Sequence, residues 1–107
     1  MGLLWEHFVL NELHARLQVH DIRYWRDKRG HEIDFIIVRR GAPPIAIECK
    51  WSADAFDPSN LAAFRRAYPD GANAVVAHDV ERSYTRRYDE LIVEVTSLPE
   101  LIQMLKP

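Results

Sequence analysis

The sequence contains a single cysteine, Cys49, and four glycines that stand apart from one another in 107 residues. One cysteine cannot build an internal disulfide framework, and it favours a reducing, cytoplasmic location. Isolated glycines exclude a glycine-rich P-loop. No apolar run approaches the roughly 20 residues that span a bilayer, and the early acid Glu6 is unlike a signal peptide. The five histidines are scattered, without zinc-ligand spacing.

The composition that remains is that of an ordinary folded protein. Hydrophobic residues make up 48% and charged residues 28%, and the net charge is −2. This apolar content excludes disorder for most of the chain. The length predicts a single domain over residues 1–107. A slightly acidic chain does not suit indiscriminate nucleic-acid binding, although it can carry a local basic face.

Local patterns predict the element order α-β-β-β-α-β-β-α. Asp57 followed by Pro58 marks the start of the second helix, and Ser97 caps the third. We expect residues 79–90, which are mostly polar, to form a loop. The predicted helices cover residues 3–19, 58–68 and 98–105, and the predicted strands cover 22–27, 32–38, 44–50, 73–77 and 91–95. This order predicts an α/β fold, a mixed sheet with helices packed on it.

The first predicted helix carries an acid where apolar residues are expected. At about 100° per residue, Glu6 falls in the middle of the stripe formed by Leu3, Leu10, Leu13 and Leu17. A buried carboxylate must become neutral, find a partner or bind a cation. The alternative is that Glu6 lies near the helix end, where water reaches it and the helix dipole favours its charge.

A second acid lies within the predicted strand 32–38. Alternation would point Ile33, Phe35 and Ile37 to one face and Asp34 to the other. Aspartate is a poor strand former, so a position in mid-strand needs a specific reason.

The next predicted strand places Glu48 and Lys50 on one face, two residues apart. If the two strands pair through the turn at 39–43, Asp34 and Glu48 approach each other. Two carboxylates about 4 Å apart repel by roughly 4 kcal/mol at an effective dielectric near 20. Lys50 offsets part of that repulsion, and a hard divalent cation such as Mg²⁺ would offset more. The alternative is a buried Glu48–Lys50 ion pair, with Asp34 as an edge residue.

Three segments in this order resemble the PD-(D/E)XK nuclease superfamily. They are Gly2-x-x-x-Glu6, His31-Glu32-Ile33-Asp34-Phe35-Ile36-Ile37 and Ile45-Ala46-Ile47-Glu48-Cys49-Lys50. More narrowly, the chain is similar to the nuclease-like domain that follows an AAA-type P-loop ATPase in many bacterial and archaeal proteins. The resemblance implies a restriction-endonuclease-like αβββαβ core. Ile33 stands where the family name has proline, and an ATPase half is absent, so we expect a fragment or C-terminal domain of a longer ATPase.

The resemblance also implies roles for individual residues. Asp34 and Glu48 would be Mg²⁺ or Mn²⁺ ligands, helped by the backbone carbonyl of Cys49. Lys50 would orient or deprotonate the attacking water and stabilise charge on the phosphate, and Glu6 would be a further ligand or hold a metal-bound water. The implied function is metal-dependent hydrolysis of DNA. The alternative is a catalytically silent nuclease-fold module that binds DNA or a protein partner for an AAA-type ATPase, in the same or another chain.

A basic segment lies beside the candidate site. Residues 23–40 contain six positive and three negative side chains, in a chain that is acidic overall. Arg26, Lys28 and Arg29 are the candidate contacts to DNA phosphates. The alternative is that they only keep a turn soluble.

The three tryptophans are candidates for stacking on bases. In a domain of this size, core or interface positions are the more common role. Trp5 falls off the main apolar stripe of the first helix, so we expect it to contact an ATPase domain or a second copy of the chain.

Overall fold

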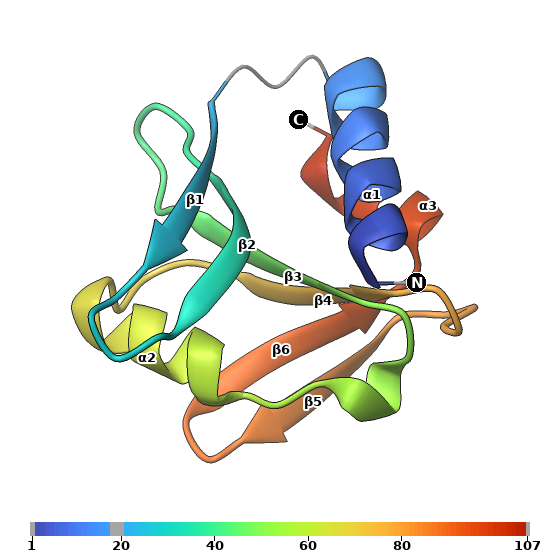
Figure 1. The fold of residues 1–107 in the computed structure, drawn as a ribbon. Coiled ribbons are helices and arrows are strands. Elements are labelled where there is room, and N and C mark those ends of the chain that lie inside the picture. The colour runs from blue at the N-terminus through green and yellow to red at the C-terminus, as the bar shows by residue number, and fades with distance from the viewer. Residues whose placement is uncertain (1, 18–20, 107) are drawn as a thin grey trace.

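The computed structural model describes residues 2–17 and 21–106, which form a six-stranded mixed sheet with helices on both faces (Figure 1). The predicted α/β class, a mixed sheet flanked by helices, is therefore confirmed. The elements are α1 (Gly2–Leu17), β1 (Ile22–Arg26), β2 (Glu32–Ile37), β3 (Ile45–Lys50), the 3₁₀ turn η1 (Ala53–Ala55), α2 (Ser59–Ala67), β4 (Asn73–Ala77), β5 (Tyr84–Tyr88), β6 (Leu91–Thr96) and α3 (Leu98–Leu105).

The sheet has the strand order β1-β2-β3-β4-β6-β5. Strands β1, β2 and β3 pair antiparallel, β3, β4 and β6 pair parallel, and β5 closes antiparallel on β6. The parallel step from β3 to β4 needs a crossover, which α2 supplies. Helix α2 covers one face of the sheet, whereas α1 and α3 cover the other (Figure 1).

Each face of the sheet has its own apolar core. The larger core lies under α1 and α3, and its fully buried members include Val9, Leu13, Ile37, Ile47 and Leu101. The smaller core lies under α2, where Ile33, Ile36, Ala46, Leu61, Phe64, Val75 and Val93 meet. Strand β3 contributes to both cores by alternation. Its odd-numbered residues face α1, and its even-numbered residues face α2.

The buried side of α1 differs from the predicted leucine stripe. Leu3 is 67% exposed, while Trp5, Val9 and Leu13 are buried. Trp5 was expected outside the core, yet its indole Nε1 donates a hydrogen bond to the Val76 carbonyl at 3.1 Å. Because α1 packs against both the sheet and α3, its buried arc is rotated toward Trp5. The predicted end of this helix, at Val19, lies outside the described residues.

The predicted loop at 79–90 contains a strand, β5, so that prediction was wrong. Four of its five residues are exposed and Tyr88 is half-buried, which leaves no apolar alternation to detect. Backbone pairing with β6 holds the strand at the sheet edge. The hairpin turns at Asp89, whose φ of 56° is tolerated by aspartate better than by most residues.

A buried arginine ties the starts of β3 and β4 together. Arg65, in α2, is only 9% exposed. Its guanidinium donates to the carbonyls of Pro44 at 3.0 Å and Ala72 at 2.7 Å. Gly71 closes over this group with φ +131°, and a Cβ there would lie 2.1 Å from the Pro44 oxygen. Arg65 therefore stabilises the fold, and its buried guanidinium is not exposed for contact with a substrate phosphate.

Candidate metal and nucleic-acid site

Strand β2 carries Asp34 at a break in its alternation. The pairing between β1 and β2 slips by one residue at this point. As a result Ile33 packs beside Ile36 in the core under α2, and not with Phe35 and Ile37 as expected. Bulges of this kind redirect a side chain and end regular pairing. An aspartate is tolerated at position 34 because the regular pairing of β2 with β1 is interrupted there.

The ladder between β2 and β3 ends beside the two acids. Its last regular pair joins Phe35 to Ile47, and continuing that register would place Asp34 opposite Glu48. Instead of a further backbone pair, Asp34 Oδ2 accepts a hydrogen bond from the Cys49 amide at 2.8 Å. The predicted pairing of the two strands therefore brings both carboxylates to one end of the ladder.

Glu48 is buried, with only 2% of its surface exposed. Its Oε1 accepts a long hydrogen bond from Asn60 Nδ2 at 3.4 Å. Its Oε2 is shielded from solvent and has no hydrogen-bond partner within the described residues. Burial, followed by the negative charge of Asp34, raises the pKa of Glu48 to about 7, although Lys50 opposes the shift. An unpartnered buried carboxylate oxygen of this kind requires an explanation.

Asn60 is a site residue that the sequence reasoning missed. It lies in the first turn of α2 and also accepts a hydrogen bond from the Glu32 amide at 3.3 Å, so it links β2 to Glu48. Helix α2 begins at Ser59, one residue later than expected, and the Asp57 carboxylate accepts from the Ser59 amide at 2.8 Å. The predicted start of α2 could have pointed to Asn60, because it places this residue in the first turn of the helix.

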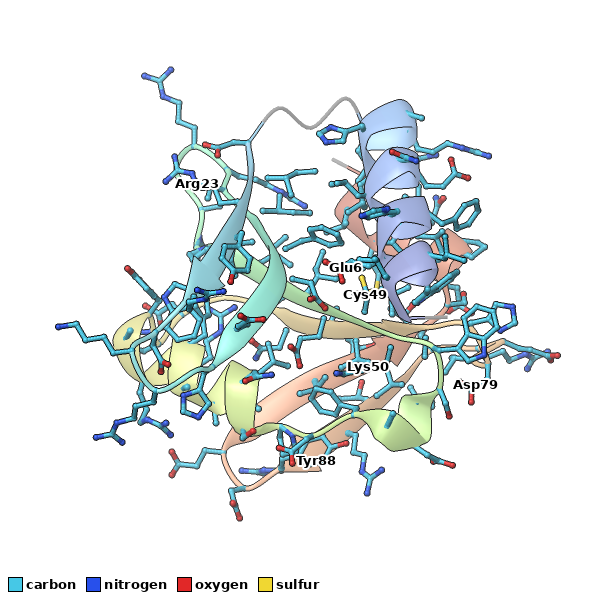
Figure 2. The ribbon with its side chains drawn as sticks, in the orientation of Figure 1. Glu6, Arg23, Cys49, Lys50, Asp79 and Tyr88 are labelled. Atoms are coloured by element: carbon cyan, nitrogen blue, oxygen red, sulfur yellow. The ribbon has the colours of Figure 1, made fainter. Side chains whose placement is uncertain are left out.

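Glu6 reaches the same region from α1. It is half-buried, and burial followed by the charge of Asp34 raises its pKa. Burial likewise raises the pKa of Asp34, against the opposing effects of the Cys49 amide and Lys50. Figure 2 shows Glu6 above Cys49 at the foot of α1, with Lys50 below β3. The negative charge of Asp34, at the end of the β2–β3 ladder, therefore raises the pKa of both Glu6 and Glu48.

The donor set fits a hard cation in part. Within residues 2–17 and 21–106, no three histidine, cysteine, aspartate or glutamate side chains gather closely enough to hold an ion. Glu6 thus does not join Asp34 and Glu48 as a third side-chain ligand. Two carboxylates and the Cys49 carbonyl are oxygen donors of the kind Mg²⁺ binds together with water. The unpartnered Glu48 oxygen is the observation in favour of such an ion.

The Cys49 thiol takes no part in this donor set. It packs against the core under α1. Burial, together with the charges of the surrounding carboxylates, raises its pKa, so the thiol stays protonated at neutral pH.

The predicted phosphate-binding residues lie on the β1–β2 hairpin. The Arg26 guanidinium donates to Glu32 at 3.1 Å and to the Tyr24 hydroxyl at 2.9 Å, so it is engaged within the hairpin. Lys28 and Arg29 are exposed in the turn at its tip. The structure therefore leaves the last two side chains directed at solvent and gives Arg26 an internal ion pair.

Two hollows on the surface lie elsewhere. One of about 930 Å³ lies between α2 and the β5–β6 hairpin. The other, of about 700 Å³, lies between α1 and α3. Neither is lined by Asp34, Glu48 or Lys50. The chemistry of its side chains therefore identifies the candidate site.

Residues 1–101 match the family model described as a domain of unknown function, DUF4143. The chain belongs to the DUF4143 family. Its fold is similar to that of a chain in the Thermococcus gammatolerans assembly described as McrB AAA+ hexamers with bound McrC. The TM-score is 0.66 at 13% identity, over 91% of this chain and 28% of that one, so the likeness shows a shared fold. A search of curated proteins finds no match.

The described part of this DUF4143 chain, residues 2–17 and 21–106, has no helix long and apolar enough to cross a membrane.

Proposed function

We propose that this DUF4143 domain hydrolyses phosphodiester bonds in DNA with the help of Mg²⁺ or Mn²⁺, as its resemblance to PD-(D/E)XK nucleases implies. The observation that carries the proposal is Glu48. This carboxylate is 2% exposed, has an oxygen without a hydrogen-bond partner in the described chain, and stands next to Asp34. Burying such a pair is costly unless a cation or proton compensates.

The ion would be held by Asp34, Glu48 and the carbonyl of Cys49. When bound, a divalent ion polarises a phosphoryl oxygen and lowers the pKa of a coordinated water. Asn60 orients Glu48 through its amide. Glu6, half-buried on the opposite side of β3, holds a water by hydrogen bonding.

Lys50 supplies positive charge to the substrate. It shares the α2-facing side of β3 with Glu48, and its charge opposes the rise in the Glu48 pKa. An ammonium group fixed beside the phosphate stabilises the negative charge that develops during hydrolysis, and it can orient the attacking water. The exposed Lys28 and Arg29 of the hairpin then contact neighbouring phosphates, with Arg26 as the less available member.

We also propose that the domain works beside an AAA-type ATPase, in the same or another chain, in the cytoplasm. Two observations support this partner. The motifs around Glu6, Asp34 and Glu48 resemble those of nuclease-like domains that follow such ATPases, and the fold is similar to a chain of an assembly that contains AAA+ hexamers.

Mn²⁺ binding by calorimetry tests the metal site. Asp34→Asn and Glu48→Gln should each abolish the binding seen with wild type. Glu32→Gln is the matched control, because Glu32 is an exposed acid near the site whose carboxylate pairs with Arg26. The metal site is refuted if wild type does not bind Mn²⁺, or if both variants bind as wild type does.

Hydrolysis of labelled DNA tests catalysis separately. Lys50→Ala should retain Mn²⁺ binding but lower the rate by about 100-fold or more. Equal rates for wild type and Lys50→Ala would show that the activity comes from elsewhere.

The silent binding module is the second candidate. It is favoured because no group of three histidine, cysteine, aspartate or glutamate side chains in the described residues is placed to hold a metal ion. DNA binding without Mn²⁺ binding would select this function.

A further inference from the structure

The three tryptophans occupy different environments. Trp5 is buried in the core under α1, and Trp25 packs half-buried on Phe64 with ring centroids 5.2 Å apart. Trp51 is 36% exposed and follows Lys50 directly. Among the tryptophans, therefore, Trp51 presents its ring at the surface next to the candidate site.

The Trp51 ring is held in place by other aromatic rings. It lies parallel to His78, with centroids 3.8 Å apart and planes 10° apart. Trp5 meets both rings edge-on, at 6.0 Å and 5.7 Å. Trp5 is itself anchored by its hydrogen bond to the Val76 carbonyl. A ring fixed in advance loses little freedom when a ligand stacks on it.

The segment after Trp51 is also fixed. Asp79 accepts hydrogen bonds from the Ser52 hydroxyl and the Ala53 amide, both at 2.9 Å. The turn between β3 and η1 is thus tied to the residue that follows His78.

The sheet order decides where the open face of Trp51 points. Lys50 pairs with Ala77, so Trp51 and His78 leave the parallel strands β3 and β4 side by side. His78 covers the indole on the β4 side. The strand order places β2, which carries Asp34, on the side of β3 opposite β4. Contact with Trp5 places the ring on the α1 side, where Glu6 also lies.

We propose that Trp51 stacks on an unpaired base of the nucleotide next to the phosphate held at Asp34, Glu48 and Lys50. Trp51 directly follows Lys50, the last residue of β3. The two side chains lie on opposite faces of the strand, so a nucleotide would have to meet both of them at the strand end. A base inside a duplex is covered on both faces by its neighbours, whereas an unpaired base can stack on an aromatic side chain. The substrate class is therefore single-stranded DNA or an unpaired end. This inference rests on the proposed function.

Binding of labelled oligothymidylate, measured by fluorescence anisotropy in Ca²⁺, tests the proposal. Trp51→Ala should weaken binding by roughly 5- to 100-fold, the range expected for one base stack, and Trp51→Phe should retain most of the affinity. An abasic oligonucleotide of equal length should bind wild type and Trp51→Ala equally, because it has no base to stack. Phe8→Ala is the matched control, since Phe8 is 51% exposed and also stacks on Trp5. A blunt duplex should show no dependence on Trp51.

Several outcomes would overturn the stacking role. One is that wild type fails to bind the oligothymidylate, and another is that Trp51→Ala binds it as tightly as wild type does. The role is also overturned if Trp51→Ala loses as much affinity for the abasic strand as for the oligothymidylate. An equal loss on Phe8→Ala would instead indicate a general apolar surface for a protein. The binding assay needs no hydrolysis, so it separates this inference from the proposed function. Base-dependent binding in Ca²⁺, together with no cleavage of labelled DNA in Mn²⁺, would retain the stacking role of Trp51 and refute the proposed catalysis.

Discussion

Removing the charge of Glu48 should stabilise the protein in the absence of metal. Burial and the nearby Asp34 raise the pKa of Glu48 from 4.5 to about 7. Between these two values the folded state binds more protons than the unfolded chain does. Stability therefore falls as pH rises from about 4.5 to about 7, and it stays low above that range. Glu48→Gln cannot ionise, so it escapes this loss.

The magnitude follows from the size of the shift. A rise from 4.5 to about 7 corresponds to about 3 kcal/mol of unfolding free energy at pH 8. Because Glu48 is only 2% exposed, solvent screening removes little of that value. A glutamine retains an oxygen that can accept from Asn60, but its amide group brings donors that need partners. We therefore expect a net gain of about 1–3 kcal/mol at pH 8.

Urea denaturation in EDTA, from pH 5 to pH 8.5, measures this effect. The advantage of Glu48→Gln over wild type should be small at pH 5, where Glu48 is protonated, and should grow through neutral pH. Glu32→Gln, which changes an exposed acid, should shift stability by less than about 1 kcal/mol at every pH. The reasoning fails if Glu48→Gln is no more stable than wild type at pH 8. It also fails if the difference between the two proteins does not change with pH.

Two further changes test how the structure supports the site and the fold. Asn60→Ala removes the hydrogen-bond donor to Glu48, so the pKa of Glu48 should rise further and Mn²⁺ affinity should fall about 10- to 100-fold. Denaturation at several pH values measures the pKa, and calorimetry measures the affinity. If neither value changes, Asn60 does not orient the carboxylate. Gly71→Ala should cost more than about 3 kcal/mol in denaturation experiments, because it strains φ +131° and drives a Cβ into the Pro44 carbonyl. Gly41→Ala, which has φ +74° and open space, should cost only about 1 kcal/mol, and equal costs for the two glycines would contradict the clash.

Much of the fold could be predicted because its signals are local. Strand β3 begins with the apolar run Ile45-Ala46-Ile47 and follows a turn that contains Gly41 and Pro43. The Ser97 hydroxyl caps α3 by accepting from the Glu100 amide at 3.3 Å. Strand β5 could not be found in this way, because an edge strand with almost no buried side chain carries no alternation. The orientation of α1 was misjudged for a related reason. A helix that touches both a sheet and another helix buries an arc that its leucines alone do not define.

Some features of the candidate site could likewise be predicted from local sequence patterns, and others depend on tertiary packing. The sequence by itself determined that Glu48 and Lys50 share one face of a strand, because residues two apart in an extended chain must do so. It also placed Asp34 on the neighbouring strand of the hairpin. Tertiary structure decided that Asp34 lies at a bulge, that Glu48 loses its solvent, and that Asn60 reaches it. It likewise left Trp51 exposed while burying Trp5. These properties depend on which elements pack together across long sequence distances, and no local spacing encodes that choice.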